Sequence, residues 1–167
     1  MKKYKNIIFL FFVILSTINS QTVWSSQNAL ATAYLVVPLS ITASVGDLDF
    51  GEIILTGSPT SINITPRDGK LFVVTGHPNR NVTFTFNNVT LDNNAWASTS
   101  GGNVDNLTFI PSVQLDDGTL LNNGDSKQLI LDGNIGKLNV WVGGRIDISA
   151  TQEVGDYIGQ FTLIVNY

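Results

Sequence analysis

The chain has 167 residues, with 13 acidic and 9 basic side chains and no cysteine. The absence of cysteine excludes disulfide bonds, thiolate metal sites, cysteine nucleophiles and lipid attachment at a cysteine. Three of the basic residues lie in the leader described next. The mature protein is therefore more acidic still, which argues against nucleic acid and anionic lipid as partners.

Residues 1–20 have the layout of a secretory signal peptide. Lys2, Lys3 and Lys5 precede an apolar run at 7–15, and small and polar residues follow it. The apolar run is too short to cross a bilayer, which takes about 20 residues. We therefore predict export, cleavage after Ser20, and a mature chain of residues 21–167 that folds as a single domain.

The strongest pattern in the mature chain is a two-residue period. Apolar side chains fill the odd positions of residues 31–45, which predicts a strand with one buried face. Pro38 lacks an N–H, so this strand should lie at a sheet edge or break there. Residues 138–148 alternate in the same way, and Gly143 and Gly144 predict a bulge or bend. Shorter strand-like runs occupy 61–65, 70–76, 81–86, 107–115, 127–131 and 161–167.

Turn-forming residues separate these runs, and no window shows an apolar helical period with caps. Short strands between turns predict an all-β sandwich or barrel. An eight-stranded outer-membrane barrel fits the length and the alternation. The middle strands are shorter than the about 9–11 residues that a membrane strand needs, so the sequence favours the sandwich, with no stable membrane insertion.

Four short motifs follow one another along the mature chain. They are Leu-Asp-Phe-Gly at 48–51, Thr-Gly at 75–76, Val-Gly-Gly at 142–144 and Gly-x-Tyr-x-Gly at 155–159, and Tyr167 follows them. With these motifs the chain resembles the secreted bacterial family catalogued as domain of unknown function 4402. The resemblance covers nearly all of the mature chain.

That family is similar to pilin and spore-coat-U-like adhesin domains of Gram-negative bacteria. The resemblance implies an antiparallel, immunoglobulin-like Greek-key sandwich, exported to the periplasm, cell surface or medium. Counting the strand-like runs of the sequence gives about eight or nine strands. It implies a structural or adhesive role in a surface fibre and no enzyme activity or cofactor. Many pilin-like relatives carry a disulfide, and this chain has no cysteine to form one.

Two segments are candidates for pairing with another protein subunit by β-strand addition, because a sheet edge offers unpaired N–H and C=O groups. One is the last run, which has Phe161, Leu163, Val165 and Tyr167 on one face. The other is the N-terminal segment 21–45. The alternative is that both segments pair inside their own domain, because eight or nine strands are enough to form a complete sandwich. The sequence alone favours this alternative.

The sequence offers little catalytic chemistry. His77 is the only histidine and lies in a turn-like stretch before a proline. The acidic groups Asp47, Asp49 and Glu52, and Asp116, Asp117 and Asp125, lack the spacing of a calcium loop. We therefore expect no enzyme activity, no metal and no cofactor.

Two further positions carry a structural expectation. Leu48 and Phe50 are expected to anchor the core, and Gly51 to adopt a backbone conformation that other residues resist. Trp141 lies on the polar face of a predicted strand, where an exposed ring can stack on a sugar or anchor a partner. The alternative for Trp141 is coverage by a neighbouring loop.

Overall fold

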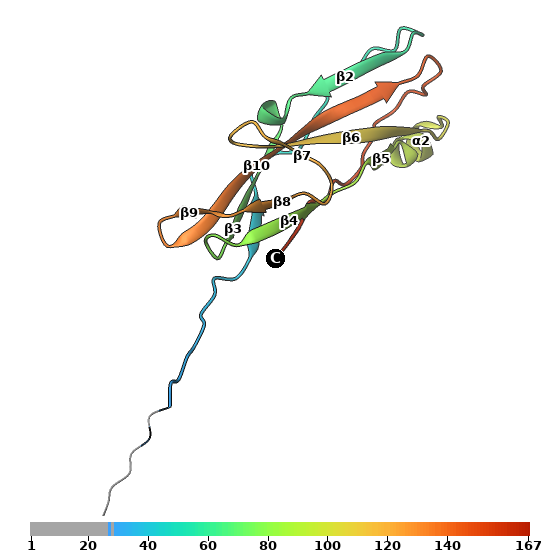
Figure 1. Cartoon of the computed structure of the whole chain (residues 1–167). Helices are drawn as coiled ribbons and strands as arrows, with labels where there is room; N and C mark the ends of the chain where they lie inside the picture. The colour runs from blue at the N-terminus through green and yellow to red at the C-terminus, as the bar shows by residue number, and fades with distance from the viewer. Residues whose placement is uncertain (1–26, 28) are drawn as a thin grey trace, which may run out of the picture. The chain divides into compact units, whose positions relative to one another are not determined.

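The computed structural model describes residue 27 and residues 29–167, which belong to two units, Met1–Tyr34 and Leu35–Tyr167. The predicted leader and its cleavage site lie outside the described residues. The described part of the first unit has no regular secondary structure. All the strands that the structure describes belong to the second unit (Figure 1).

Eleven strands in two antiparallel sheets make up the second unit, so the prediction of eight or nine was slightly low. The larger sheet has the path β1-β3-β10-β6-β5, with β2 and β9 on other parts of β10 and β7 on β6. Its strands are β1 (Ser40–Ala43), β2 (Thr60–Ile64), β3 (Lys70–Gly76), β5 (Val89–Asp92), β6 (Asn106–Leu115), β7 (Leu120–Leu121), β9 (Ile130–Asp132) and β10 (Ile135–Ile148).

The smaller sheet has the order β11-β4-β8. Its strands are β11 (Ile164–Asn166), β4 (Asn81–Thr85) and β8 (Ser126–Gln128). A short helix α2 (Asn94–Ser100) and a 3-10 turn η2 (Pro66–Asp68) complete the described elements. Sequence analysis found neither α2 nor β5.

The two sheets enclose an apolar core. Val74, Val140 and Val142 of the larger sheet and Val82 and Phe84 of the smaller sheet are fully buried there. The inward side chains alternate with outward ones along β3, β4 and β10, as the two-residue period predicts. The all-β sandwich is therefore confirmed. Neither sheet closes on itself within residues 35–167, so the barrel alternative finds no support.

The sequence predicts a bulge or a bend at the glycine pair of β10, Gly143 and Gly144. The pairing of β10 with β6 keeps one register from Val140 to Ile146, so no bulge occurs. Instead, the pair lies where β10 changes partner from β3 to β2. A Cβ on Gly143 would lie 2.3 Å from the Ile64 carbonyl oxygen. The Val-Gly-Gly motif thus allows backbones to approach closely at the junction of three strands.

The first predicted strand is much shorter than its alternation suggests. Only β1 pairs with a neighbour, and it begins two residues after Pro38 at the edge of the larger sheet. The expectation that the proline breaks an edge strand is confirmed. The described residues before it have no regular secondary structure.

Within the described residues, no helix is long and apolar enough to cross a membrane.

Candidate functional site

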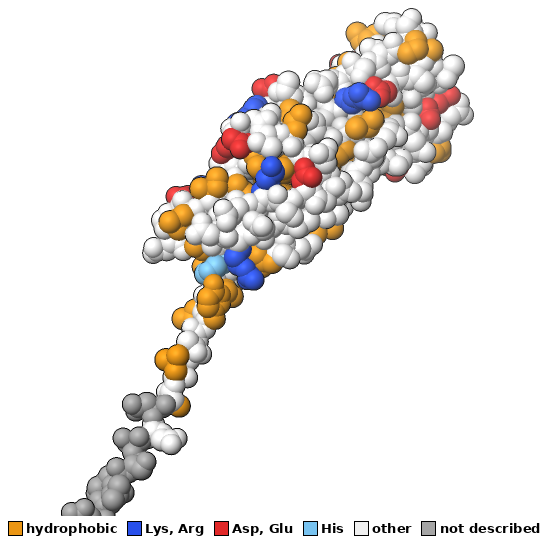
Figure 2. Space-filling model, in the orientation of Figure 1, with side chains coloured by type: hydrophobic (Ala, Val, Ile, Leu, Met, Phe, Trp, Pro, Cys, Tyr) orange, Lys and Arg blue, Asp and Glu red, His pale blue; other side chains and the backbone are white. Residues whose placement is uncertain are grey.

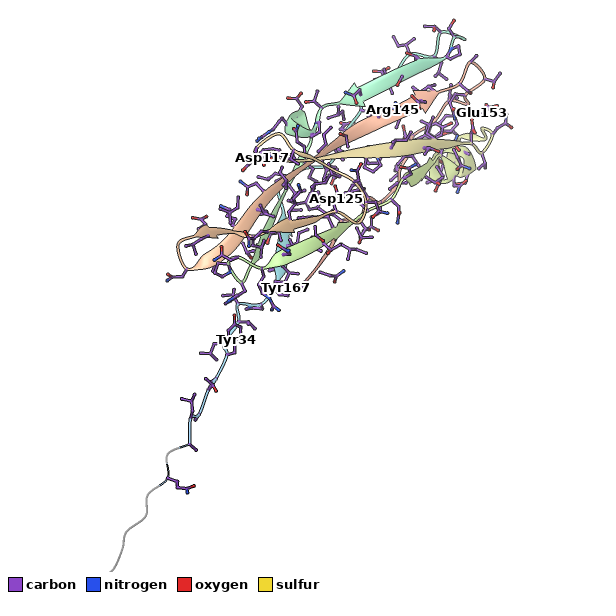
Figure 3. The ribbon with its side chains drawn as sticks, in the orientation of Figure 1. Tyr34, Asp117, Asp125, Arg145, Glu153 and Tyr167 are labelled. Atoms are coloured by element: carbon purple, nitrogen blue, oxygen red, sulfur yellow. The ribbon has the colours of Figure 1, made fainter. Side chains whose placement is uncertain are left out.

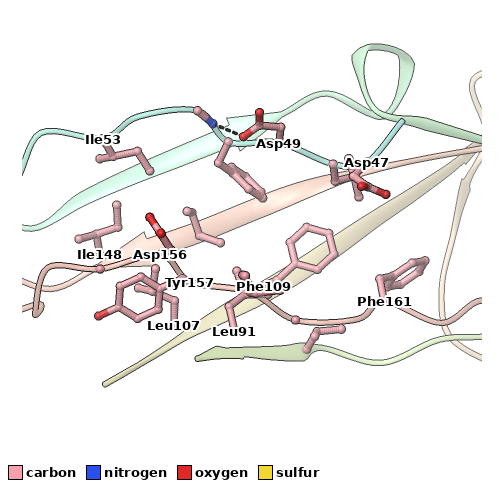
Figure 4. Close-up of a pocket in the computed structure, with 18 of the residues that line it drawn as sticks. Asp47, Asp49, Ile53, Leu91, Leu107, Phe109, Ile148, Asp156, Tyr157 and Phe161 are labelled. Atoms are coloured by element: carbon pink, nitrogen blue, oxygen red, sulfur yellow. Dashed lines mark hydrogen bonds between the residues drawn. The ribbon is translucent and has the colours of Figure 1, made fainter. Parts of the chain in front are cut away.

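The sandwich is open along one side, where a groove runs over one end of the larger sheet. Its volume is about 1010 Å³, and segments 47–55 and 152–161 form its two walls (Figure 4). The floor is apolar and comes from three neighbouring strands, β5, β6 and β10. Its residues are Val89, Leu91, Leu107, Phe109, Ile146 and Ile148.

Neither wall is a regular strand of a sheet. No strand pairs with residues 47–55 among those that the structure describes. Residues 152–161 pair only at Ile158, whose N–H and C=O bond to Asp92 of β5 at 2.9 and 3.0 Å. The groove therefore has an apolar floor between two walls whose backbones largely lack strand partners.

Side chains hold the first wall in place. Leu48 packs against both apolar clusters of the sandwich, and the Phe50 ring meets Phe109 edge-on with centroids 5.9 Å apart. Gly51 has φ of +71° and donates its N–H to Asp49 Oδ1 at 2.8 Å (Figure 4). The core-anchoring roles predicted for Leu48 and Phe50 and the backbone conformation predicted for Gly51 are therefore what the structure shows.

A buried polar network holds the second wall. Asn93 is fully buried. Its Nδ2 donates to the carbonyls of Asn103 and Val154 at 3.0 and 3.2 Å, and its Oδ1 accepts the N–H of Asp105 at 2.7 Å. The Asp105 carboxylate in turn accepts the Glu153 N–H at 3.1 Å. Loop 149–157 is thereby tied to the chain around α2.

The Gly-x-Tyr-x-Gly motif fits this wall residue by residue. Gly155 has φ of +145°, and a Cβ there would lie 2.9 Å from the Trp96 ring. The Tyr157 hydroxyl donates to the Glu153 carbonyl at 2.8 Å, and its ring packs on the floor cluster. A Cβ on Gly159 would lie 2.6 Å from the Thr90 carbonyl oxygen. The motif therefore lets the second wall lie directly against β5 and α2.

Two pKa values reflect this network. The pKa of Asp105 is lowered below its ordinary value of 3.8 by hydrogen bonds from two backbone N–H groups. The bond from Glu153 has the larger effect and the bond from Asn106 the smaller. Burial raises the pKa of Tyr157 above its ordinary value of 10.0. Both groups therefore keep their neutral-pH charge states, a carboxylate and a phenol.

The rim of the groove is acidic. Asp47, Asp49, Glu52, Glu153 and Asp156 line it, whereas Lys70 is the one basic side chain in its lining. Lys70 lies 3.6 Å from Asp47. Among the described residues, no three acidic or histidine side chains are placed to hold a metal ion. On the face seen in Figure 2, most basic side chains lie beside acidic ones.

Trp141, the candidate surface contact, is engaged by its own domain. Its indole N–H donates to Asp116 Oδ1 at 2.7 Å, and the Arg67 guanidinium lies 5.1 Å from its ring centroid. Asn139 donates to the other Asp116 oxygen at 2.7 Å. The hydrogen bond from Trp141 is the main cause that lowers the pKa of Asp116. The ring is thus covered by Arg67 from η2, the kind of coverage given as the alternative.

The candidate pairing strand lies at a sheet edge, but three of its four named side chains, Phe161, Leu163 and Val165, point inward. β11 has β4 as its single neighbour. Leu163 is 8% exposed, and Phe161 and Val165 pack against the core. Tyr167 is partly exposed (Figure 3). Its hydroxyl accepts the His77 N–H at 2.7 Å. Sequence analysis did not find the groove, because alternation in 47–55 does not reveal whether a strand pairs there.

The fold and the groove define a small antiparallel β-sandwich that is open along one side. A family model described as "Domain of unknown function (DUF4402)" matches residues 65–167. The chain belongs to this family. The match includes the motifs at 75–76, 142–144 and 155–159 and begins after the Leu-Asp-Phe-Gly motif. A comparison with curated proteins finds no match.

Proposed function

We propose that this protein is an exported, non-enzymatic structural or adhesive subunit that joins other subunits by strand addition in its groove. The observation that carries the proposal is the pair of unpaired walls over an apolar floor. An extended segment along this groove gains backbone hydrogen bonds from the walls and packs alternate side chains against their exposed apolar residues, such as Val154 and Ile158. Contact between subunits in the groove does not require pairing at the outer edge strands of the sheets.

The segment best suited to occupy the groove is the N-terminal arm, which we define as residues 21–36, supplied by a second copy. Apolar side chains occupy the odd positions 31, 33 and 35 of its C-terminal end, in step with the longer alternation of residues 31–45. The side chains of Leu30 and Leu35 are 91% and 88% exposed. Such large apolar side chains gain free energy when another surface buries them.

Charge supports the same choice of occupant. The chain has no charged side chain between Gln21 and Gly46. The groove rim is acidic, so an acidic segment would be repelled there and an uncharged one is not. Because the whole mature chain is acidic, added salt should strengthen the association of two copies by screening their repulsion.

The proposal of export rests on the leader pattern of residues 1–20. Expression of the full sequence in a Gram-negative host should release a mature protein that begins near Gln21. Mass spectrometry of the periplasmic and extracellular fractions checks this. Full-length protein confined to the cytoplasm would contradict it.

Oligomer size tests strand addition. The mature protein should form oligomers that grow with concentration in size-exclusion chromatography with light scattering. Deletion of residues 21–30 should give monomers, because the arm then loses most of its length. The matched control replaces the same ten residues by Gly and Ser, which keeps the length and removes the apolar side chains. It should also be monomeric.

Two results would contradict this proposal. One is a mature protein that stays monomeric at millimolar concentration, with or without the deletion. The other is an oligomer whose size does not change when residues 21–30 are deleted or replaced, because another surface would then hold the copies together.

A further inference from the structure

The strand β2 forms a free margin of the larger sheet (Figure 1). On one side it pairs with the second half of β10, in a register that places Ser61 opposite Asp147 and Asn63 opposite Arg145. No strand of the described residues pairs with its other side, which we name the β2 edge. Such an edge leaves alternate backbone N–H and C=O groups without strand partners, and a further strand can bind them.

The position of Pro111 shows which backbone groups of β2 face this edge. Pro111 lies in β6 opposite Gly144 of β10, and its nitrogen carries no hydrogen. Gly144 therefore bonds to its other neighbour, Ile64 of β2. Because bonding alternates along a strand, the N–H and C=O groups of Ser61 and Asn63 face outward. The β2 edge thus offers two donors and two acceptors.

The β2 edge lacks the feature that most often keeps sheet edges apart. Charged side chains commonly protect exposed edges from pairing with another chain. Residues 53–66 contain no charged side chain. Ser61 and Asn63 are exposed. Pro59 and Pro66 flank the strand and limit any further pairing to the residues between them.

The other free edges of the described residues are shorter, and several are charged or covered. β8 and β9 have three residues each and carry Lys127 and Asp132. β5 has a partner at Ile158, which pairs with Asp92. β1, β7 and β11 have four, two and three residues. β2, with five residues, is therefore the longest described strand with an open side.

Two antiparallel copies of β2 match each other. With a two-fold axis at Ile62, Ser61 of each copy lies opposite Asn63 of the other, and each pair can exchange two backbone hydrogen bonds. All the outward groups of both residues are then satisfied, with four bonds in total. A shift by two residues would place Asn63 opposite Pro59, which has no N–H to donate. The match therefore selects one register.

Side-chain charge fits the same arrangement. On the outward face of β10, Arg145 lies opposite Asn63 and Asp147 opposite Ser61, and the two charged groups are 3.4 Å apart. The two-fold axis brings Arg145 of one copy into the same cross-strand row as Asp147 of the other, on both sides of the axis. Like charges therefore do not face each other across the contact, and such pairs would destabilise it.

We infer that the β2 edge binds the β2 edge of a second copy and so joins the two larger sheets into one continuous sheet. The contact uses a different surface from the groove, so it does not rest on the proposed function. One pair of five-residue strands is far smaller than the interfaces of about 1,200 Å² or more that hold stable dimers, so two free copies pair only transiently. Where copies are already joined in chains, many such contacts act together and hold the chains side by side.

Single cysteines test this register, because the natural chain contains no cysteine. The mature protein carries Ile62→Cys, Thr60→Cys or Ile64→Cys, and mild oxidation traps transient pairs as disulfides that non-reducing gels detect. At the axis, the two cysteines at position 62 have Cα atoms about 4.5 Å apart, within the range for a disulfide. Position 60 instead lies opposite position 64 of the second copy, about 13 Å along the strand from position 60 of that copy.

The register predicts which cysteines react. We expect Ile62→Cys to crosslink more than about tenfold faster than Thr60→Cys or Ile64→Cys alone, because only position 62 meets its own counterpart. An equal mixture of Thr60→Cys and Ile64→Cys should form a mixed dimer faster than either variant crosslinks with itself. If Ile62→Cys has no such advantage, or the mixture gives no mixed dimer, the inference is overturned.

Substitutions at Asn63 in the Ile62→Cys protein test the backbone bonds. Asn63→Pro removes one outward N–H from each copy, and with it two of the four bonds, without removing a bond to β10. Each bond shifts an equilibrium by about fivefold, so crosslinking should slow by more than about tenfold. Asn63→Lys adds a charge at the edge and should also slow it. The matched control, Thr108→Lys, adds the same charge at an exposed position of β6 and should leave the rate unchanged.

The inference and the proposed function fail separately. Oligomer growth is measured on the cysteine-free mature protein, and the crosslinking pattern should persist when residues 21–30 are deleted. If oligomers grow but the pattern is absent, or neither Asn63 variant slows crosslinking, the inference is overturned and strand addition in the groove stands. If the pattern is present but no oligomers grow, the groove proposal fails and the β2 contact stands. Circular dichroism shows that each variant compared retains its sheets.

Discussion

The two halves of the sandwich cover the same sheet in different ways. β10 contributes Val140 and Val142 to one apolar cluster and Ile146 and Ile148 to the other. The first cluster is covered by the paired strands of the smaller sheet, which contribute Val82 and Phe84. The second is covered by walls that side chains, rather than strand pairing, hold in place. We name these the closed half and the open half.

This difference shows how a groove can persist without an occupant. In the closed half, backbone hydrogen bonds and side-chain packing support each other. In the open half, anchors such as Phe50 and the network around Asn93 and Asp105 fix the walls and leave their outer backbone groups available. A groove that is held open in this way does not lose free energy to rearrangement when a strand enters it.

The largest expected effect separates the two halves by core truncation. Phe84 is fully buried in the closed half, so Phe84→Ala should lower the free energy of unfolding by about 4 kcal/mol. Phe50 is half-buried in the open half, and Phe50→Ala should cost about 2 kcal/mol. Urea unfolding of both variants measures the difference. Equal losses would mean that the open half is packed as tightly as the closed one.

A glycine at the boundary of the halves gives the next effect. Gly144 has φ of +151°, and a Cβ there would lie 2.5 Å from both the Ile110 carbonyl oxygen and the Phe109 ring. Gly144→Ala should therefore destabilise by about 3 kcal/mol. Gly118 also has a positive φ but open space around it. Gly118→Ala should therefore destabilise by only about 1 kcal/mol, from conformational strain. Thermal unfolding of both variants measures the difference. Equal decreases in melting temperature for both variants would contradict the steric argument.

The closed half was easier to predict from sequence than the open half. The predicted run 70–76 coincides with β3, and the run 138–148 forms most of β10, because strict alternation over many residues marks a half-buried strand. β5 was missed because four residues between turn formers carry little periodicity. α2 was missed because its residues, Asn-Ala-Trp-Ala-Ser-Thr-Ser, show no apolar stripe.

The candidate site depends on contacts that sequence periodicity does not contain. Residues 47–55 look as strand-like as many paired segments, and only the arrangement of the other strands leaves them unpaired. The polar wall network joins Asn93, Asp105 and Glu153, which are far apart in sequence. Arg67 covers Trp141 from an element 74 positions earlier. Of these positions, only residues 48–51 belong to a motif that the sequence analysis singled out.

A smaller effect concerns the open half alone. The Tyr157 hydroxyl donates to the Glu153 carbonyl and accepts from Gln152 Nε2 at 2.9 Å. Tyr157→Phe should lower the free energy of unfolding by about 1 kcal/mol, because the Glu153 carbonyl loses its donor while the ring still packs. Amide hydrogen exchange should also quicken in 152–161 and stay unchanged in β3. Uniform quickening in both regions would contradict a role confined to the wall.

The smallest effect is a dependence on pH that should also differ between the halves. The pKa of Asp105 is lowered in the folded protein, so its carboxylate adds stability above the ordinary pKa of 3.8 and loses it as pH falls through the lower folded value. Asp105→Asn should therefore lower the melting temperature at pH 6. The difference in melting temperature between Asp105→Asn and the natural protein should become smaller toward pH 2.

Asp117 provides the comparison for this last effect. Its pKa is lowered mainly by the N–H of Thr119, two residues away, so its bonds close only its own turn. A contact this local can persist in part when the chain unfolds, which reduces the difference between the two states. Asp117→Asn should thus change the pH profile of the melting temperature less than Asp105→Asn does. Parallel profiles for the natural protein and Asp105→Asn would show that the carboxylate does not stabilise the groove wall.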